Sequence, residues 1–274
     1  MASRINIIKA SGVSEPFIKE KLLNSIRKSG ASDVAAGKAL THIENELRDG
    51  MSTGQIYNHA FDVLKRLEQK AARSYSLRRA IAGLGPTGFP FERFISEIMK
   101  KKGFQTAVGE ILLGRCVEHE IDVVAWNDKK LVMIETKFHN EIGVKTDLKV
   151  SLYVKARYDD LSENQFDFGG RRFLDEGWLV TNTKFTSNAI KFGKCANLNL
   201  IGWSYPSNGN LQNLVEDFSL QPITVMTTLK SGEIKQLLDR GVVLCGDLRR
   251  AELLRDIGIG HDRIGAIITE AETC

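Results

Sequence analysis

Two short apolar runs on either side of a polar turn limit what the middle of this chain can fold into. Residues 121–125 read Ile-Asp-Val-Val-Ala, residues 131–134 read Leu-Val-Met-Ile, and turn-forming residues occupy 127–130. Short runs rich in β-branched and apolar residues, separated by a turn, predict a β-hairpin. The second run leads directly into Glu135-Thr136-Lys137. The segment therefore predicts buried strands that carry charged groups where packing favours apolar ones.

Asp122 and the Glu135-Thr136-Lys137 tripeptide predict a metal site. Strand side chains alternate between faces, so Glu135 and Lys137 are expected on one face and Thr136 on the other. Carboxylates are the hard oxygen ligands that Mg²⁺ takes together with water and phosphate. The ion lowers the pKa of a bound water, and Lys137 would orient that water or stabilise developing negative charge. The alternative is an ion-paired hairpin on a solvated face.

These residues resemble the PD-(D/E)XK nucleases, specifically the Mrr-like restriction endonucleases. A helix with apolar residues at 91, 94, 95 and 98 is expected before the hairpin, and a strand at 178–181 followed by a helix at 187–196 is expected after it. Glu92 matches the helix glutamate of that family. As an alternative, Glu92 is an ordinary first-turn acid that the helix dipole favours. The proline that the family has before Asp122 is replaced by Ile121.

The resemblance implies a restriction-endonuclease-like mixed sheet flanked by helices and a metal-dependent cleavage of DNA. Glu92, Asp122, Glu135 and Lys137 would be the catalytic residues. Asp122, Glu135 and the carbonyl of Thr136 would hold Mg²⁺, with Mn²⁺ as an alternative ion.

A basic amphipathic helix is expected over residues 145–157, directly after the hairpin. In nucleases of this resemblance the helix after the catalytic strand lines the active site, so Lys149 is a candidate DNA contact, with Lys155 and Arg157 as weaker candidates. A solvated face of lysines is the alternative.

The first 85 residues predict a strand and four helices. Residues 5–9 alternate like a strand, helices are expected over 17–29 and 32–48, and Ser52 or Thr53 caps a third helix that a fourth follows to Ala82. This order resembles the ATP-cone domain, the nucleotide-sensing lid of ribonucleotide reductases and their repressors.

The ATP-cone resemblance implies a site for ATP or dATP. Lys9 and Lys21 would pair with the nucleotide phosphates, Glu15 would lie near the base or ribose, and Thr53 would bind at a helix start, where backbone amides favour anions. The chain has no G-x-x-x-x-G-K-[ST] loop, so we expect binding without hydrolysis. Solvated lysines and a simple helix cap are the alternative.

Two segments rich in turn-forming residues divide the chain into three predicted domains. Residues 83–90 contain three glycines and two prolines, which cannot continue a helix, and turn residues gather again at 206–210. We therefore expect an ATP-cone at 1–85, a nuclease domain at 89–208 and a helical segment at 211–274.

The last segment is expected to be helical over 232–238, 247–257 and 261–271, with a Gly-Ile-Gly turn between the last two helices. It resembles a helix-hairpin-helix, which implies that Gly258 and Gly260 contact the DNA backbone. A small helical cap without a ligand is the alternative.

Bulk properties fit this interpretation without deciding it. A net charge of +4 is compatible with a polyanionic partner, and four cysteines without C-x-x-C spacing indicate neither a zinc knuckle nor a disulfide framework. The sequence shows no leader and no long apolar run, so we expect a cytoplasmic protein without membrane contact.

We therefore expect a modular α/β fold and a metal-dependent DNA endonuclease with ATP or dATP as regulatory ligand. Because cutting both strands usually needs two active sites, a homodimer or higher homo-oligomer is expected. Two alternatives remain: a nucleotide-responsive DNA-binding regulator with a catalytically silent nuclease fold, and a structural protein in which the acids form surface ion pairs.

Overall fold

The computed structural model describes residues 5–9, 12–27, 29–141 and 143–274, apart from the side chains at 70 and 73. The chain divides into two compact units, residues 1–79 and 80–274. Each contains helices and strands, so the expected modular α/β class is confirmed. The finer division into three domains stays a prediction.

The first unit combines a three-stranded sheet with helices. The strand order is β2-β1-β3, and the strands are β1 (Asn6–Ile8), β2 (Ser14–Pro16) and β3 (Met51–Ser52). The helices are α1 (Lys19–Arg27), α2 (Asp33–Glu46), α3 (Thr53–Leu67) and α4 (Gln69–Ala82), the last of which continues into the second unit. Ser52, rather than Thr53, caps α3 and forms a capping box with Gln55. Apolar side chains such as Ile26, Ile43 and Leu64 form the core of this unit.

The second unit is built on a five-stranded mixed sheet of order β12-β10-β6-β5-β4. Its strands are β4 (Gln105–Leu113), β5 (Glu118–Trp126), β6 (Leu131–Lys137), β10 (Glu176–Thr181) and β12 (Asn199–Ile201). Strands β4, β5 and β6 are antiparallel to their neighbours in this series, whereas β6, β10 and β12 run parallel. The predicted hairpin is confirmed as β5 and β6.

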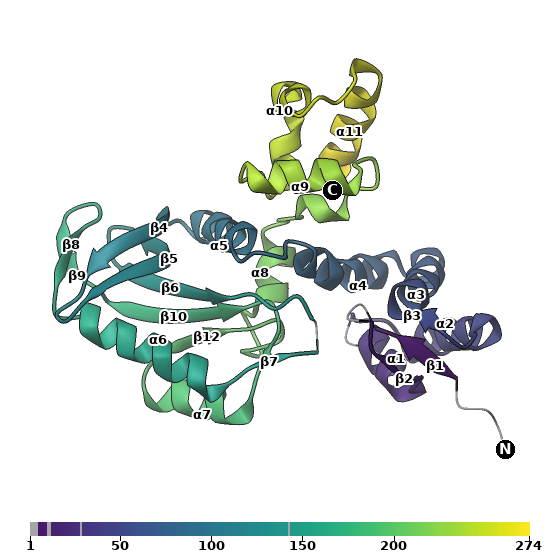
Figure 1. Ribbon diagram of the computed structural model, residues 1–274, viewed down its shortest axis with the longest axis horizontal. Coiled ribbons are helices and arrows are strands. Elements are labelled where there is room, and N and C mark those ends of the chain that lie inside the picture. The colour runs from purple at the N-terminus through teal and green to yellow at the C-terminus, as the bar shows by residue number, and fades with distance from the viewer. Residues whose placement is uncertain (1–4, 10–11, 28, 142) are drawn as a thin grey trace. The chain divides into compact units, whose positions relative to one another are not determined.

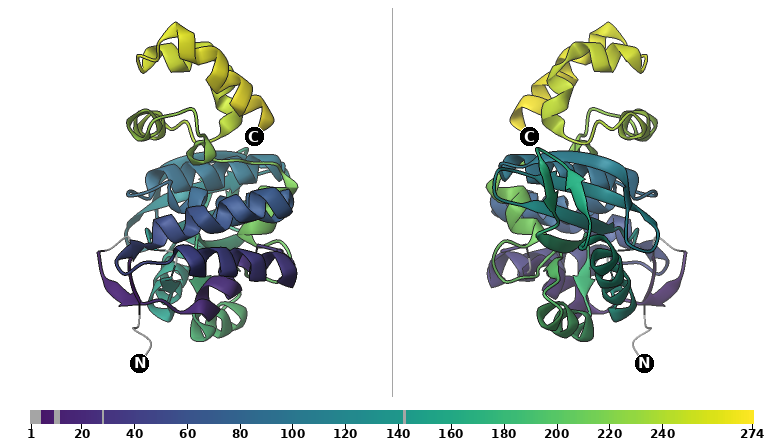
Figure 2. Two further views of the ribbon diagram at one scale, coloured as in Figure 1. Left: turned by 90° about the vertical axis from the view of Figure 1, so that its right-hand side faces the viewer. Right: turned by 90° about the vertical axis from the view of Figure 1, so that its left-hand side faces the viewer.

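Helices cover both faces of this sheet, as Figures 1 and 2 show. Helix α5 (Phe89–Lys101) lies on one face, and α6 (Leu148–Leu161) and α7 (Ser187–Cys195) lie on the other. Strand residues such as Met133 and Leu179 pack with Val154 of α6 and Ala189 of α7 in one apolar cluster. Both faces of the central strands are therefore buried, which explains why their sequences are almost continuously apolar.

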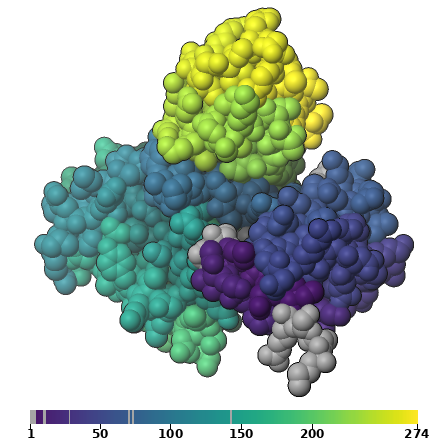
Figure 3. Space-filling view, turned by 45° about the vertical axis from the view of Figure 1, so that its right-hand side comes forward, coloured from purple at the N-terminus to yellow at the C-terminus, as the bar shows by residue number. Residues whose placement is uncertain are grey.

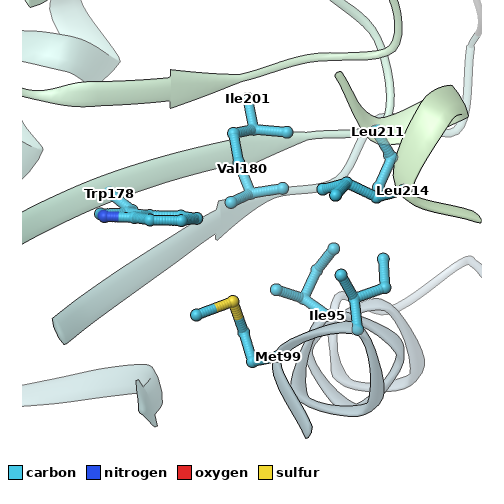
Figure 4. Close-up of a pocket in the computed structure, with 8 residues that line it drawn as sticks. Ile95, Met99, Trp178, Val180, Ile201, Leu211 and Leu214 are labelled. Atoms are coloured by element: carbon cyan, nitrogen blue, oxygen red, sulfur yellow. The ribbon is translucent and has the colours of Figure 1, made fainter. Parts of the chain in front are cut away.

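A small gap remains on the α5 side of the sheet, as Figure 4 shows. Its volume is about 10 Å³, close to the space of one water molecule. The gap is lined by apolar side chains of α5, β10, β12 and α8 (Leu211–Asp217): Ile95, Ile98, Met99, Trp178, Val180, Ile201, Leu211 and Leu214. It is an imperfection of core packing and offers no polar group to a ligand.

The connections hold more structure than the sequence indicates. Residues 145–146 form β7, paired with β11 (Lys184–Phe185), so the predicted helix at 145–157 begins later, at Leu148, and Asp147 caps it. The connection after this helix contains a hairpin of β8 (Gln165–Asp167) and β9 (Arg171–Phe173). The capping aspartate is the sequence signal that would have placed the helix start correctly.

The C-terminal part of the second unit is helical, as expected, and forms a lobe of its own (Figure 3). It contains η1 (Ile223–Val225), α9 (Ser231–Asp239), η2 (Cys245–Arg249), α10 (Ala251–Asp256) and α11 (His261–Thr273). The single helix predicted at 247–257 is wrong, because the backbone becomes extended at Arg250, with φ −91° and ψ 104°. Among the described residues, no helix is long and apolar enough to cross a membrane.

Two helical glycines of the second unit provide a test of its packing. A Cβ at Gly193 of α7 would lie 2.6 Å from Leu200 Cδ1 and 3.2 Å from the Leu198 carbonyl oxygen, whereas a Cβ at Gly265 of α11 meets nothing within 4 Å. Gly193→Ala is therefore expected to lower the free energy of unfolding by about 1–3 kcal/mol, because the core is overpacked. Gly265→Ala is expected to raise it by up to about 1 kcal/mol, because alanine favours the helix.

Urea unfolding followed by tryptophan fluorescence measures both effects, since Trp126, Trp178 and Trp203 all belong to the second unit. Equal stability of the two variants would contradict the close contact of α7 with β12.

Candidate functional site

The register of β5 and β6 brings the two predicted acids together. Val123 pairs with Ile134 in this antiparallel ladder, and the next step along it places Asp122 opposite Glu135. Asp122 Oδ2 accepts hydrogen bonds from the Thr136 amide at 2.7 Å and from the Thr136 hydroxyl at 3.0 Å. Asp122 thus lies inside β5 rather than at a strand exit, and cross-strand pairing places it beside Glu135.

Glu135 is buried and meets a cation that the sequence gave little weight. Only 7% of the residue is exposed, and its Oε2 lies 2.6 Å from Arg157 Nη1. A second nitrogen of the guanidinium donates to the carbonyl of Glu120 on β5. Arg157 belongs to α6, which packs on the sheet. The packing of α6 therefore supplies the positive charge that pairs with Glu135.

Glu92 completes a group of three carboxyls that repel one another. Burial and then the charge of Asp122 raise the pKa of Glu92 to about 7. The same two causes raise the pKa of Glu135 to about 8, against the attraction of Arg157. Burial also raises the pKa of Asp122, although the Thr136 donors oppose it. Three carboxyls that disfavour their own ionisation are a site with a deficit of positive charge.

Lys137 ends β6 and is exposed, and among the described residues it forms no ion pair. Its carbonyl oxygen accepts a hydrogen bond from the buried Thr181 hydroxyl at 2.7 Å. Beyond it, the amide of His139 donates to Asn182 Oδ1, and the Asn182 side chain donates back to the His139 carbonyl, both at 2.8 Å. This polar frame at the ends of β6 and β10 fixes the backbone from which the Lys137 ammonium extends.

The oxygen atoms of this site are of the type that binds a divalent cation. In the part of the chain that the structure describes, no group of three or more His, Cys, Asp and Glu side chains is arranged to hold a metal ion. One buried oxygen, Glu135 Oε1, nevertheless has no hydrogen-bond partner and is therefore available to a ligand. Asp122, Glu135 and a main-chain carbonyl such as that of Thr136 supply oxygen donors of the kind that Mg²⁺ prefers. By donor type, these residues are suited to the ion.

The remaining predicted DNA contacts lie away from these acids in sequence. Lys149 is exposed in the first turn of α6. Gly258 and Gly260 flank the turn between α10 and α11, where Gly258 has a φ of +80° and Gly260 caps α11. The Gly-Ile-Gly turn thus connects two helices, as its sequence predicts, and its contact with DNA stays a prediction.

The predicted nucleotide residues Lys9, Glu15 and Lys21 form one charge cluster in the first unit. Glu15 pairs with Lys9 at 2.9 Å and with Lys21 at 3.4 Å. Ile8 of β1 lies beside Ser52 of β3 in a parallel register, and Lys9 and Thr53 directly follow these two residues in the sequence. Two cations and one carboxylate are therefore in contact, and Thr53 begins the helix that follows the neighbouring strand.

Arg79 is a further cation near that helix start. Its guanidinium lies 4.4 Å from the ring centre of Tyr57 and donates to Asn58 Oδ1 at 3.0 Å. A Cβ atom on Gly54 would lie 3.7 Å from Arg79 Nη2. The sequence alone does not single out Arg79, because only the fold brings it to the tyrosine on α3.

Comparisons with known proteins agree with the architecture. Residues 5–83 match the ATP cone domain, which confirms the first predicted domain, and residues 222–273 match the C-terminal domain described as AF1548-like. The chain thus combines an ATP cone with a mixed α/β unit that ends in an AF1548-like helical segment.

An uncharacterized protein of Archaeoglobus fulgidus is 38% identical over 180 residues, 65% of this chain and 98% of the relative. The crystal structure of AF1548, a protein of unknown function, is 34% identical, with a TM-score of 0.58 over 68% of this chain and 97% of that one. The chain therefore belongs to the AF1548-like family. The MspJI restriction endonuclease in complex with an oligonucleotide gives a TM-score of 0.33 at 14% identity.

Neutralising Asp122 separates stability from function. Asn at this position can still accept from Thr136 through its carbonyl oxygen, and it removes one of the charges that repel Glu92 and Glu135. We expect the free energy of unfolding of Asp122→Asn to be higher than that of wild type, or lower by no more than about 0.5 kcal/mol. Thermal unfolding in the presence of a chelator measures this, and a large loss of stability would show that the Asp122 charge is structural.

Proposed function

We propose that this protein is a metal-dependent DNA endonuclease of the PD-(D/E)XK type, and that its ATP cone binds ATP or dATP. The observation that carries the proposal is the group of Glu92, Asp122 and Glu135, which are brought together from three elements and leave a buried carboxylate oxygen without a partner. Mutually repelling carboxylates are stabilised by a cation, and a bound Mg²⁺ or Mn²⁺ would supply Lewis-acid polarisation of a phosphodiester and a more acidic water.

The chain's own residues have distinct tasks in this proposal. Asp122 and Glu135 hold the cation, helped by the Thr136 carbonyl. The Lys137 ammonium, exposed at the strand end, orients the attacking water or stabilises charge that develops on the phosphate. Glu92, whose pKa of about 7 lets it carry a proton at neutral pH, can exchange that proton through its carboxyl oxygen.

DNA would be bound through phosphates rather than through base edges. Lys149 and the Gly258 and Gly260 turn are the proposed contacts, because a lysine and the amides at a helix start both bind phosphate without reading sequence. A homo-oligomer with paired sites would cut both strands.

The ATP cone would bind nucleotide through charge exchange. In the structure Glu15 neutralises Lys9 and Lys21. Nucleotide phosphates would take over both lysines and lie near Thr53, where the start of α3 presents backbone amides. Glu15, released from the lysines, could then accept from the ribose or the base.

A second function is favoured by one specific observation. Because Arg157 already pairs with Glu135, the acids could be permanently neutralised. The protein would then be a nucleotide-responsive DNA-binding regulator with a silent nuclease fold. Cleavage of DNA distinguishes this function from the first.

A plasmid assay tests the proposed cleavage. Wild-type protein incubated with supercoiled plasmid and Mg²⁺ or Mn²⁺ is expected to produce nicked or linear DNA, and Asp122→Ala is expected to lower the rate at least about 100-fold, because the ion loses a ligand. Asp128→Ala is the matched control, since Asp128 is an exposed carboxylate in the β5–β6 turn. Equal cleavage by wild type and Asp122→Ala would remove Asp122 from the site, and DNA binding without cleavage would favour the regulator.

A calorimetric titration tests the nucleotide site. ATP or dATP added to the full-length protein is expected to bind, and Lys21→Ala is expected to weaken binding about tenfold, because a phosphate loses a charged donor. Lys19→Ala is the control, since Lys19 begins the same helix, α1, and pairs with Glu44 rather than with Glu15. Identical affinities of the two variants would contradict the assignment of Lys21.

A further inference from the structure

Arg157 is fixed at the acidic site by contacts with two strands and with its own helix. It pairs with Glu135 of β6 at 2.6 Å and donates to the Glu120 carbonyl of β5. Its guanidinium also lies 5.2 Å from the ring centre of Tyr153, one turn earlier on α6. Only 12% of the Arg157 side chain is exposed. The cation is therefore a part of the site, unlike an arginine on a solvated helix face.

The ion pair between Arg157 and Glu135 is incomplete on both sides. Glu135 Oε1 and Arg157 Nε are both buried, and neither has a hydrogen-bond partner. A buried arginine and carboxylate stabilise a fold when the pair is bidentate and the remaining polar atoms are satisfied. Here one oxygen of the carboxylate stays available, so the geometry fits an exchangeable partner of Glu135 better than a permanent one.

Charge in the site makes Arg157 and a divalent cation alternatives. The guanidinium offsets part of the repulsion among Glu92, Asp122 and Glu135. A divalent ion bound to the same carboxylates would supply that compensation with twice the charge. It would also bring like charge next to the guanidinium, which is unfavourable at short range in a poorly solvated site.

We propose that Arg157 compensates the charge of Glu135 in place of a metal ion. Its guanidinium pairs with Glu135 in the metal-free protein and releases that carboxylate when a divalent cation binds. The inference rests on the proposed function, because it takes the ion to bind these acids. It adds that the metal affinity of the wild-type protein is lowered by the cost of breaking the ion pair. Arg157 thereby sets the metal concentration at which the site becomes occupied.

Calorimetric titration of Mn²⁺ into the full-length protein, without DNA, tests the exchange. Arg157→Met is expected to bind Mn²⁺ about tenfold more tightly than wild type, because the ion no longer displaces a charge-assisted hydrogen bond. Arg157→Lys keeps the charge and loses the planar guanidinium. Its Mn²⁺ affinity is expected to lie between those of wild type and Arg157→Met. Glu135→Gln is expected to abolish the heat of Mn²⁺ binding, which would assign that heat to this site.

The matched control is Arg115→Met. It removes the same charge from the same unit, but from an exposed pair of Arg115 with Glu163 at 3.0 Å. Its Mn²⁺ affinity is expected to equal that of wild type. Tighter binding by this variant as well would mean that net charge, rather than the Arg157 contact, determines the affinity, and would overturn the inference.

The outcomes separate the inference from the function on which it rests. Mn²⁺ binding that is unchanged or weaker in Arg157→Met overturns the inference alone, because Arg157 would then support Glu135 rather than compete with the ion. Absence of Mn²⁺ binding at millimolar concentration in wild type and in Arg157→Met overturns the metal-dependent function together with it. If tryptophan fluorescence shows that Arg157→Met does not fold, Arg157→Lys decides, and an affinity no tighter than that of wild type overturns the proposal.

Discussion

The mutual repulsion of Glu92, Asp122 and Glu135 is the constraint on which the rest of the second unit depends. Ionised carboxylates in a poorly solvated place cost free energy, and each one raises the cost of ionising the others. The fold holds them there through the covalent and hydrogen-bonded frame of the sheet, because β5 and β6 are locked in register and α5 packs on β4 and β5. Stability of the surrounding core is what keeps these charges together.

That core is apolar on both faces of the central strands. Residues 131–134 of β6 are fully buried immediately before Glu135, so the strand cannot shift by one position without turning its apolar set and its acid to the wrong faces. The same packing fixes the position of Glu135 and limits its contact with water. A buried carboxylate costs local stability, and in the proposed function a cation would offset that cost.

The sequence predicted the elements better than it predicted their partners. The β5–β6 hairpin, α5 and the helices of the ATP cone follow from local periodicity and turn residues, and the structure confirms them. Strand β4 escaped prediction, because Gly109 interrupts its apolar pattern and because its stability comes from pairing with β5. The break at Arg250 escaped for a similar reason, since helical periodicity continues through it while the backbone does not.

The site shows the same division between local and non-local information. Asp122, Glu135 and Lys137 are close in sequence, so a hairpin is enough to predict that they are neighbours. Arg157 lies twenty-two residues beyond Glu135 on a helix whose basic residues look equivalent in the sequence. Only the packing of α6 on the sheet selects Arg157 and leaves Lys149 exposed.

The incomplete pairing of Arg157 gives a physical reason why these acids can be kept together without a ligand. A complete bidentate pair would neutralise Glu135 fully and leave it nothing to offer a cation. No pair at all would leave the three carboxyls without an opposing charge and would raise the pKa of Glu135 further. A single-ended pair lies between these limits, since it holds Glu135 in place and leaves Oε1 free. The proposed metal site thereby joins two requirements that otherwise oppose each other, a folded protein in the absence of metal and a carboxylate oxygen to which a metal ion could bind.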